Sequence, residues 1–175
     1  RALYLKPMQT GADSDTGTVR ELAGLDALDA PPPIVELARP ASVDQAAAAE
    51  GRRVTLAEVL AGIAARQGLA PGARWLLECA GGLRVPLNDH EDQLALLARL
   101  GAPVVLVARS ALGTLNHTLL SVEALLARGL RVRGLFLVGE RHRDNERSLA
   151  VRLECPIYPL PRFASLDSAA LDGWL

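Results

Sequence analysis

The feature that most constrains this chain is a repeated order of short apolar runs and helical segments. Residues 104–108 form a continuous, valine-rich run, which is typical of a strand covered on both faces of a parallel sheet. Residues 132–138 form the next predicted strand, and a helical segment over 114–127, closing at Gly129, separates the two. Strands that alternate with helices in this way predict an α/β fold with a parallel sheet.

The same alternation extends over the rest of the chain. The run at 74–79 indicates another buried strand, Ser42 is a plausible N-cap, and Thr55 with Glu58 forms a capping box. We therefore expect one domain over residues 1–175, with a parallel sheet covered by helices on both faces. The further predicted strands lie at 2–5 and 157–161, and the further helices at 43–50, 56–68, 91–100, 144–153 and 167–174.

Composition excludes several classes of function. The chain has 175 residues, half of them hydrophobic, and a formal charge of -1, which indicates an ordinary globular protein and not a dedicated nucleic-acid or membrane-surface binder. No apolar run is long enough to cross a bilayer. Cys79 and Cys155 stand alone, so neither a zinc ribbon nor a disulfide scaffold is indicated, and we expect a reduced, cytoplasmic setting.

Lys6 is the only lysine in a chain that otherwise uses arginine for its fixed positive charges. A compact ammonium differs chemically from a planar guanidinium, so a lone lysine hints at a position that needs a point charge. Pro7 restricts Lys6 to an extended conformation, which ends the first predicted strand at this point. Open α/β sheets bind ligands at the carboxyl ends of their strands, and this is where Lys6 is expected to lie.

Acidic residues follow two of the predicted strands. Asp13 and Asp15, spaced by one residue, could bind a cation or cap the next helix. Glu78 comes at the end of an apolar run, beside Gly81 and Gly82, where an ionised carboxylate has to be paired with an arginine or bound to a metal. Both alternatives remain open from the residues alone.

The start of the helix over 114–127 offers a third candidate site. Its first turn contains Thr114, Leu115 and Asn116, whose backbone N–H groups lack partners within the helix and could bind an anion. His117, in the same turn, is more consistent with a structural or solvent-facing position than with catalysis.

Taken together and in order, these motifs resemble the dethiobiotin synthetase family of P-loop proteins. Each motif is weak alone, but the ordered set is specific and spans nearly the whole chain. The segments are YLKPMQTG at 4–11, DSD at 13–15, ECAGG at 78–82 with VPL at 85–87, LGTLNHTLL at 112–120, and residues 134–145 and 159–161.

The resemblance implies a reaction and roles for the charged residues. In that family diaminopelargonate reacts with carbon dioxide to give a carbamate, ATP phosphorylates the carbamate, and the second amine closes the ring. Lys6 would lie beside the carbamate and the phosphate, and Thr10 would donate a hydrogen bond in the same site. Asp15 and Glu78 would be the carboxylates around Mg²⁺.

The resemblance also implies how the substrate and the nucleotide are bound. Gly81 would let the substrate approach the backbone, while Val138, Gly139 and Pro161 would line the nucleotide site. The backbone N–H groups of Thr114, Leu115 and Asn116 would bind the substrate's distal carboxylate. The family supplies that contact from the neighbouring subunit, so a homodimer is implied.

Two departures from the family leave alternatives open. The family's first strand and its glycine-rich phosphate-binding loop, which ends in Gly-Lys-Thr, do not occur in these residues, so we expect the chain to lack its first few tens of residues or to receive them from a partner segment. Val138 stands where many relatives have an asparagine that reads the base. The alternatives are a non-catalytic scaffold that lost the loop, and another P-loop ligase or amidotransferase-type domain.

Overall fold

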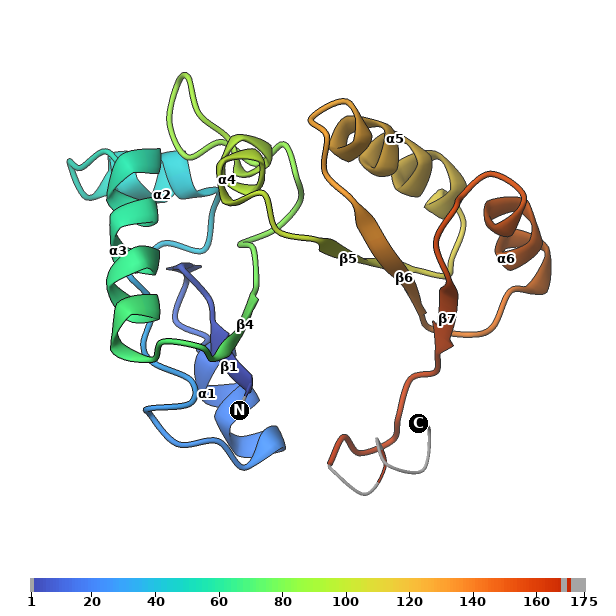
Figure 1. Cartoon of the computed structure of the whole chain (residues 1–175), viewed down its shortest axis with the longest axis horizontal. Coiled ribbons are helices and arrows are strands. Elements are labelled where there is room, and N and C mark those ends of the chain that lie inside the picture. The colour runs from blue at the N-terminus through green and yellow to red at the C-terminus, as the bar shows by residue number, and fades with distance from the viewer. Residues whose placement is uncertain (1, 168–169, 171–175) are drawn as a thin grey trace. The chain divides into compact units, whose positions relative to one another are not determined.

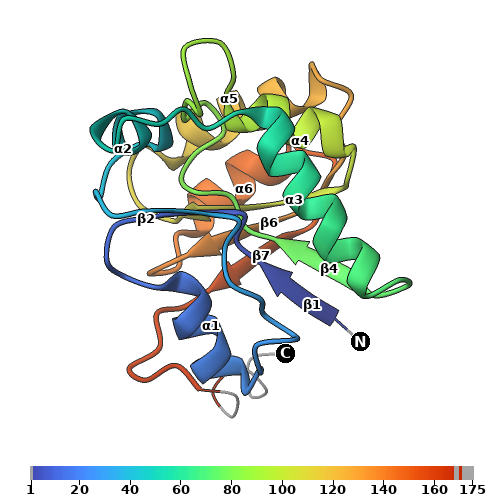
Figure 2. The same ribbon diagram turned by 90° about the vertical axis from the view of Figure 1, so that its left-hand side faces the viewer.

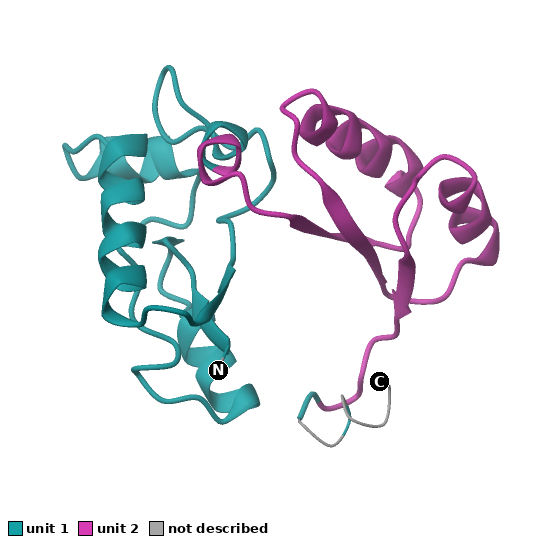
Figure 3. Ribbon diagram, viewed as in Figure 1, with its two compact units in different colours: residues 1–96, 166–175 teal, residues 97–165 magenta. Residues whose placement is uncertain are grey.

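The computed structural model describes residues 2–167 and 170, which form two compact units. Unit 1 comprises the residues up to 96 together with those from 166 onward, and unit 2 comprises residues 97–165 (Figure 3). The single domain expected over 1–175 stays a prediction. The helix expected at 167–174 lies almost wholly outside the described residues.

Every strand pair in the described part of the chain is parallel, which confirms the predicted α/β fold with parallel strands flanked by helices (Figure 1). Within the residues that the structure describes, unit 1 contains two two-stranded sheets and unit 2 contains one three-stranded sheet. The sheets are β1 (Ala2–Leu5) with β4 (Arg74–Leu77), β2 (Met8–Thr10) with β3 (Val35–Leu37), and β5 (Val104–Arg109) with β6 (Val132–Val138) and β7 (Ile157–Leu160).

The helices over 15–23 and 56–69 begin after short polar side chains that accept hydrogen bonds from the first turn. The Ser14 hydroxyl accepts from the Gly17 N–H at 3.0 Å, so this hydroxyl, and neither neighbouring carboxylate, caps the first helix. Thr55 accepts from the Glu58 N–H at 3.2 Å, as the capping box predicts. The helices are α1 (Asp15–Ala23), α2 (Val43–Ala49), α3 (Leu56–Leu69), α4 (Gln93–Leu100), α5 (Thr114–Leu126) and α6 (Arg143–Ala150).

The N-cap predicted at Ser42 is confirmed in position, although its side chain makes no capping bond. Its hydroxyl instead donates to Asp44 Oδ1 at 2.5 Å, because an ionised carboxylate two residues away is the stronger acceptor.

The core of unit 1 is built from its strands and from helices α2 and α3. Helix α3 covers one face of the β1–β4 pair (Figure 2). Leu5 and Met8 lie on either side of the turn at Lys6-Pro7, and both are fully buried. The chain at Lys6 is therefore held by packing on both sides. The other buried apolar residues of these elements include Leu3, Val35, Leu37, Val43, Val59 and Ile63.

The core of unit 2 lies between its sheet and two helices. Leu135 and Leu137 of β6 pack with Leu149 of α6, and Leu106 and Ala108 of β5 contact the same cluster. Figure 1 shows α5 and α6 on the same side of the three-stranded sheet. The burial of β5 is therefore one-sided.

The strands expected at 74–79 and 104–108 are present as β4 and β5, but the expectation that they are buried is wrong. Leu76 of β4 is 62% exposed, and Val105 and Val107 of β5 are 49% and 65% exposed. Both strands lie at the edge of a sheet in the described structure, and alternate side chains of a strand point to opposite faces. In β5 the even-numbered residues pack on the core and the odd-numbered ones do not.

Among the described residues, no helix is both long enough and apolar enough to span a membrane.

Candidate active site

The parallel pairing of β1 with β4 places two charged residues at neighbouring strand ends. Leu5 is the partner of Leu77, and the Glu78 N–H donates to the Leu5 carbonyl at 2.9 Å. Lys6 and Glu78 each follow directly after the last residue of their strand, so they leave the same edge of the sheet. This register accounts for their proximity despite the distance between them in the sequence.

Lys6 lies between two carboxylates. Its Nζ donates to Glu78 Oε1 at 3.1 Å and also to Asp15 Oδ2. Asp15 is the first residue of α1, which Ser14 caps, so the start of the helix determines where this carboxylate lies. The structure thus brings together the three charged residues singled out in the sequence. Their catalytic and metal-binding roles stay predictions.

The cluster keeps its lysine charged although the lysine is buried. The Lys6 side chain is 8% exposed, whereas those of Asp15 and Glu78 are 44% and 46% exposed. Burial by itself lowers the pKa of Lys6, but the hydrogen bonds to Asp15 and Glu78 outweigh it and raise that pKa above its usual value. The result is a fixed ammonium flanked by two accessible carboxylates.

Tyr4 is a fourth member of this cluster that the sequence reasoning missed. Its hydroxyl donates to Glu78 Oε2 at 2.7 Å, and the residue is 5% exposed. Burial, together with the Glu78 carboxylate, raises the pKa of Tyr4 well above its usual value, so the hydroxyl remains a donor. One signal was available, because Tyr4 and Lys6 are two residues apart on an extended chain and therefore share a face.

Gln93 holds the loop that follows Glu78. Its side-chain amide donates to the Ala80 carbonyl and accepts from the Ala80 N–H at 3.2 Å, and the residue is fully buried. Gly81 comes next with a φ of +86°, a conformation that other residues rarely adopt, so the turn itself requires glycine here. Sequence reasoning missed Gln93, whose only signal is an amide at the buried start of an apolar helix.

Cys79 lies in this loop and is not suited to act as a nucleophile. Burial, with a further contribution from the Glu78 charge, raises its pKa to about 11. Only the thiolate form is nucleophilic, so a thiol with this pKa is almost entirely unreactive at neutral pH.

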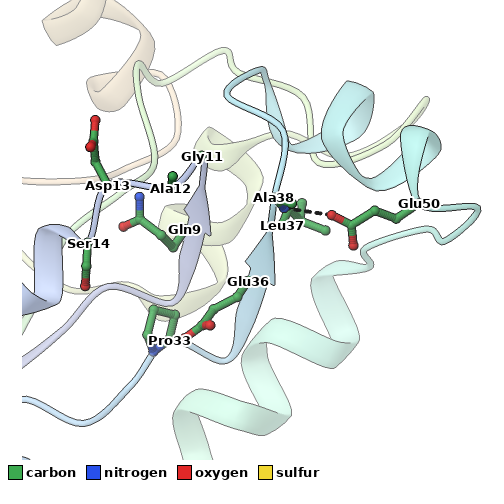
Figure 4. A pocket seen from close by; sticks show the side chains of 10 residues that line it. All are labelled: Gln9, Gly11, Ala12, Asp13, Ser14, Pro33, Glu36, Leu37, Ala38 and Glu50. Atoms are coloured by element: carbon green, nitrogen blue, oxygen red, sulfur yellow. Dashed lines mark hydrogen bonds between the residues drawn. The ribbon is translucent and has the colours of Figure 1, made fainter.

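A separate pocket of about 460 Å³ lies beside β2 and β3 in unit 1 (Figure 4). Among its lining residues are three acids, Asp13, Glu36 and Glu50, and no lysine or arginine. Glu50 reaches the backbone of Ala38, whose N–H donates to its Oε1 at 2.7 Å. The pocket lining includes neither Lys6 nor Glu78. A site lined in this way does not suit a phosphate group, which distinguishes it from the Lys6 cluster.

Thr10, predicted for the active site, is the last residue of β2 and is half-buried. Its carbonyl accepts from the Gln9 side-chain amide at 3.1 Å, and the N–H of Gly11 donates to the Leu37 carbonyl at 2.9 Å. Like Lys6, Asp15, Glu78 and Gly81, Thr10 belongs to unit 1.

The remaining predicted residues belong to unit 2. Helix α5 begins after Gly113, whose φ is +94°. The Thr114 N–H is already donated to the Ala111 carbonyl at 3.1 Å, and the Thr114 side chain is buried. Of the three amides expected to bind an anion, those of Leu115 and Asn116 therefore remain the candidates.

The ends of β5, β6 and β7 bring the predicted nucleotide-binding residues together. The Ser110 N–H donates to the Val138 carbonyl, and the Gly139 N–H donates to the Leu160 carbonyl, both at 2.9 Å. Pro161 follows Leu160 directly. A Cβ on Gly139 would lie 2.8 Å from Ser110 Oγ, so only glycine fits without a shift.

Two neutral residues that the sequence reasoning missed hold this edge of unit 2. The Ser110 hydroxyl donates to the Glu140 carbonyl at 2.5 Å, and the Asn145 amide donates to the Ser110 carbonyl at 3.0 Å. These bonds fix the turn that leads from β5 into α5.

The donor atoms of unit 1 are carboxylate oxygens, which suit a hard divalent cation. The described residues contain no group of three or more His, Cys, Asp or Glu side chains suited to holding a metal ion, which argues against a site built from protein ligands alone. Asp15 and Glu78 offer two accessible carboxylates joined through Lys6. Mg²⁺ commonly uses one or two carboxylates and completes its coordination with water and phosphate oxygens, so this donor set fits Mg²⁺.

The chain is similar to several known proteins. Residues 1–168 match the family described as "AAA domain". The chain is 39% identical to the ATP-dependent dethiobiotin synthetase BioD of Rhodopseudomonas palustris (strain BisB18), with 99% of this chain and 81% of that protein aligned. It is 45% identical to the protein of the same name from Anaeromyxobacter dehalogenans (strain 2CP-C), over 78% of this chain and 62% of that protein.

A fusion protein also matches. The biotin biosynthesis bifunctional protein BioCD of Bordetella avium (strain 197N) is 37% identical to this chain. The match covers 99% of this chain and 37% of that protein.

Proposed function

Because this chain belongs to the family of ATP-dependent dethiobiotin synthetases, we propose that it catalyses the ATP-dependent carboxylation and ring closure of diaminopelargonate to dethiobiotin. The observation that carries this proposal is the buried ammonium of Lys6 between the carboxylates of Asp15 and Glu78. The relatives' names do not favour a non-catalytic scaffold or a different P-loop ligase.

The reaction places negative charge where Lys6 can stabilise it. One amine of diaminopelargonate adds to carbon dioxide and loses a proton, which gives a carbamate. A carbamate oxygen takes the terminal phosphoryl group of ATP, and ADP leaves. The second amine then attacks the carbonyl carbon and loses a proton, and phosphate leaves as the ring closes. Negative charge builds on the carbamate and phosphoryl oxygens, and a positioned ammonium stabilises it.

Asp15 and Glu78 would hold Mg²⁺. Both carboxylates are about half exposed, which leaves their oxygens accessible to a bound metal ion. When bound, Mg²⁺ neutralises phosphate oxygens and orients the transferred group. Thr10 would donate a hydrogen bond in the same site.

The substrate and the nucleotide would use backbone positions. We assign the distal carboxylate of diaminopelargonate to the N–H groups of Leu115 and Asn116, contributed by the second subunit of a homodimer, and the approach of the substrate to Gly81. Val138, Gly139 and Pro161 are assigned to the nucleotide. The hydrogen bonds that bring the ends of β6 and β7 together support this last assignment.

The test is the incorporation of labelled bicarbonate into dethiobiotin by the purified protein, with diaminopelargonate, ATP and Mg²⁺ saturating. We expect labelled dethiobiotin and one ADP for each ring closed, and no product when ATP or Mg²⁺ is omitted. No labelled product under the complete conditions would contradict the proposed function.

A further inference from the structure

The pocket beside β2 and β3 collects acidic side chains from three segments of unit 1. Glu36 of β3 is the register partner of Gln9 of β2, so these two side chains leave the same face of the small sheet. Asp13 comes from the loop after β2, and Glu50 comes from the end of α2. The ion pairs of the described residues involve none of these three acids.

Gln9 adds a buried acceptor that lacks a donor. The residue is 9% exposed, and its Oε1 has no hydrogen-bond partner among the described residues, whereas its Nε2 donates to the Thr10 carbonyl at 3.1 Å. Figure 4 shows this side chain extending from β2 toward the segment that carries Asp13 and Ser14. A buried acceptor without a donor is costly, so a ligand that donates a hydrogen bond here would be favoured.

The lining of the pocket determines which ligands are suitable. Carboxylates and an amide oxygen accept hydrogen bonds, and no lysine or arginine lines the pocket, so a bound group should donate hydrogen bonds and carry positive charge. The three acids do not converge on one point, since the described residues contain no group of three or more His, Cys, Asp or Glu side chains suited to a metal ion. One compact cation would therefore leave carboxylates without a partner.

The size and the walls of the pocket point to an extended ligand. Its volume of about 460 Å³ is within the usual range for small-molecule sites. Apolar side chains, among them Pro33 and Leu37, line it between the acids. Several ammonium groups joined by an aliphatic chain would match both the separated charges and these apolar walls.

We propose that this pocket binds a linear aliphatic amine with two or more ammonium groups. The ammonium groups donate to the carboxylates and to Gln9 Oε1, and the methylene chain lies against Pro33 and Leu37. The inference does not rest on the proposed function, because the pocket lining includes neither Lys6 nor Glu78.

The first test is calorimetric titration of the purified protein with spermidine, and with n-butylamine as a ligand that has a single ammonium group. A hydrogen bond between charged groups contributes enough to change an equilibrium by about tenfold. We therefore expect one spermidine per chain, bound at least about tenfold more tightly than n-butylamine. Absence of spermidine binding, or equal affinity for the two amines, would overturn the inference.

The variant for this test is Glu36→Gln, which removes one charge and keeps the size of an exposed side chain. It should weaken spermidine binding by about tenfold. The matched control is Glu154→Gln, which makes the same change at an exposed position before β7 in unit 2 and should leave the affinity unchanged. An equal loss in both variants would show that spermidine responds only to net charge and would overturn the inference.

A second measurement locates the ligand in the wild-type protein and does not depend on the folding of any variant. Nuclear Overhauser effects should connect the methylene protons of spermidine with the methyl groups of Ala12 and Ala38, which both line the pocket. Contacts with other surfaces alone would overturn the inference. Displacement of spermidine by an equal concentration of Mg²⁺ would overturn it as well, because a compact ion would then satisfy the site.

Discussion

The candidate site residues of both units lie near strand ends, but they are charged in unit 1 and neutral in unit 2. In unit 1, the ends of β1 and β4 carry an ammonium and a carboxylate, and the start of α1 adds a second carboxylate. In unit 2, the ends of β5, β6 and β7 are held by neutral hydrogen bonds from Ser110, Asn145 and backbone groups. Among the candidate site residues, the charged ones belong to unit 1, and those of unit 2 offer mainly shape and backbone donors.

This difference suggests a division of work. Bond making and phosphoryl transfer need charges that are already in place, because charge develops on oxygens in the transition state. Recognition of a nucleotide or a distal carboxylate can rely on backbone geometry, which neutral residues fix well. Substitutions of the charged site residues in unit 1 should therefore affect turnover, and substitutions of the site residues in unit 2 should affect binding.

The largest effect should come from Lys6→Arg. The substitution keeps the charge but replaces a compact ammonium with a larger planar group, which cannot occupy the same point between Asp15 and Glu78. We expect turnover to fall by roughly 100-fold or more, the loss typical for removing one positioned donor to a developing oxyanion. Steady-state rates of labelled dethiobiotin formation measure it.

The matched control exchanges the same two residue types on the surface of unit 2. Arg128 lies on an exposed turn after α5, so Arg128→Lys should leave turnover unchanged. Near-wild-type turnover in Lys6→Arg would show that the position needs only a positive charge, and the proposed contrast between the units would then lose its main support.

The two cysteines, one in each unit, should differ in reactivity. The pKa of Cys79 is raised from 9.0 to about 11, mainly by burial, whereas that of Cys155 is raised by a smaller amount. A shift of this size lowers the thiolate fraction near neutral pH by about 100-fold. Mass spectrometry after brief alkylation at pH 8 should find Cys155 labelled well before Cys79, and equal labelling would contradict the burial of Cys79.

The same shift has a consequence for stability. The folded protein binds the Cys79 proton more tightly than the unfolded chain does, so this contribution to stability is complete below pH 9.0 and is lost as the pH rises through about 11. Cys79→Ala should reduce the loss of stability over that pH interval.

A smaller effect is expected from Gln93→Leu. Loss of the amide leaves the N–H and carbonyl of Ala80 without their partner, and an unsatisfied buried group costs about 1–3 kcal/mol. Its counterpart in unit 2, Asn145→Leu, removes one hydrogen bond from a half-buried side chain and should cost about 1 kcal/mol. Urea unfolding measures the free energy of unfolding of both variants. An equal or larger loss of stability in Asn145→Leu than in Gln93→Leu would contradict this ranking.

The smallest effect should come from Arg52→Ala. Its guanidinium pairs with Glu58 at 2.9 Å, and both side chains are more than a third exposed. Exposed ion pairs contribute about 0–1 kcal/mol, so unfolding should change little and turnover should not change at all. A larger loss of stability than in Gln93→Leu would mean that surface charge matters more to unit 1 than its buried hydrogen bonds.

The sequence predicted the kinds of element and their order well, because hydrophobic period and capping residues are local signals. The strand over 132–138 and the start of the helix at Thr114 were placed correctly. Burial was predicted less well. An apolar run such as 104–108 predicts a strand that is covered on both faces. The exposure of its side chains depends on what packs against the strand, and the exposed Val107 shows that one face of β5 is open.

The candidate site was only partly predicted, because some of its contacts depend on the fold and not on local sequence. Lys6 and Glu78 were found because charged residues at strand ends are conspicuous in a sequence, and Asp15 was found because it lies in an acidic loop before a helix. Tyr4 and Gln93 were not, because a tyrosine in a strand and a glutamine in an apolar helix both fit ordinary core positions. Their roles depend on the register of β1 with β4 and on a loop conformation, which no local pattern specifies.

The position of Mn²⁺, located by its anomalous scattering in crystals grown with diaminopelargonate and a non-hydrolysable ATP analogue, tests the proposed roles of Asp15, Glu78 and Lys6 most directly. We expect an Mn²⁺ peak within bonding distance of the carboxylates of Asp15 and Glu78, with the Lys6 ammonium against the phosphate oxygens. An Mn²⁺ peak bound by other side chains, with Lys6 still paired to both acids and away from the nucleotide, would contradict these roles.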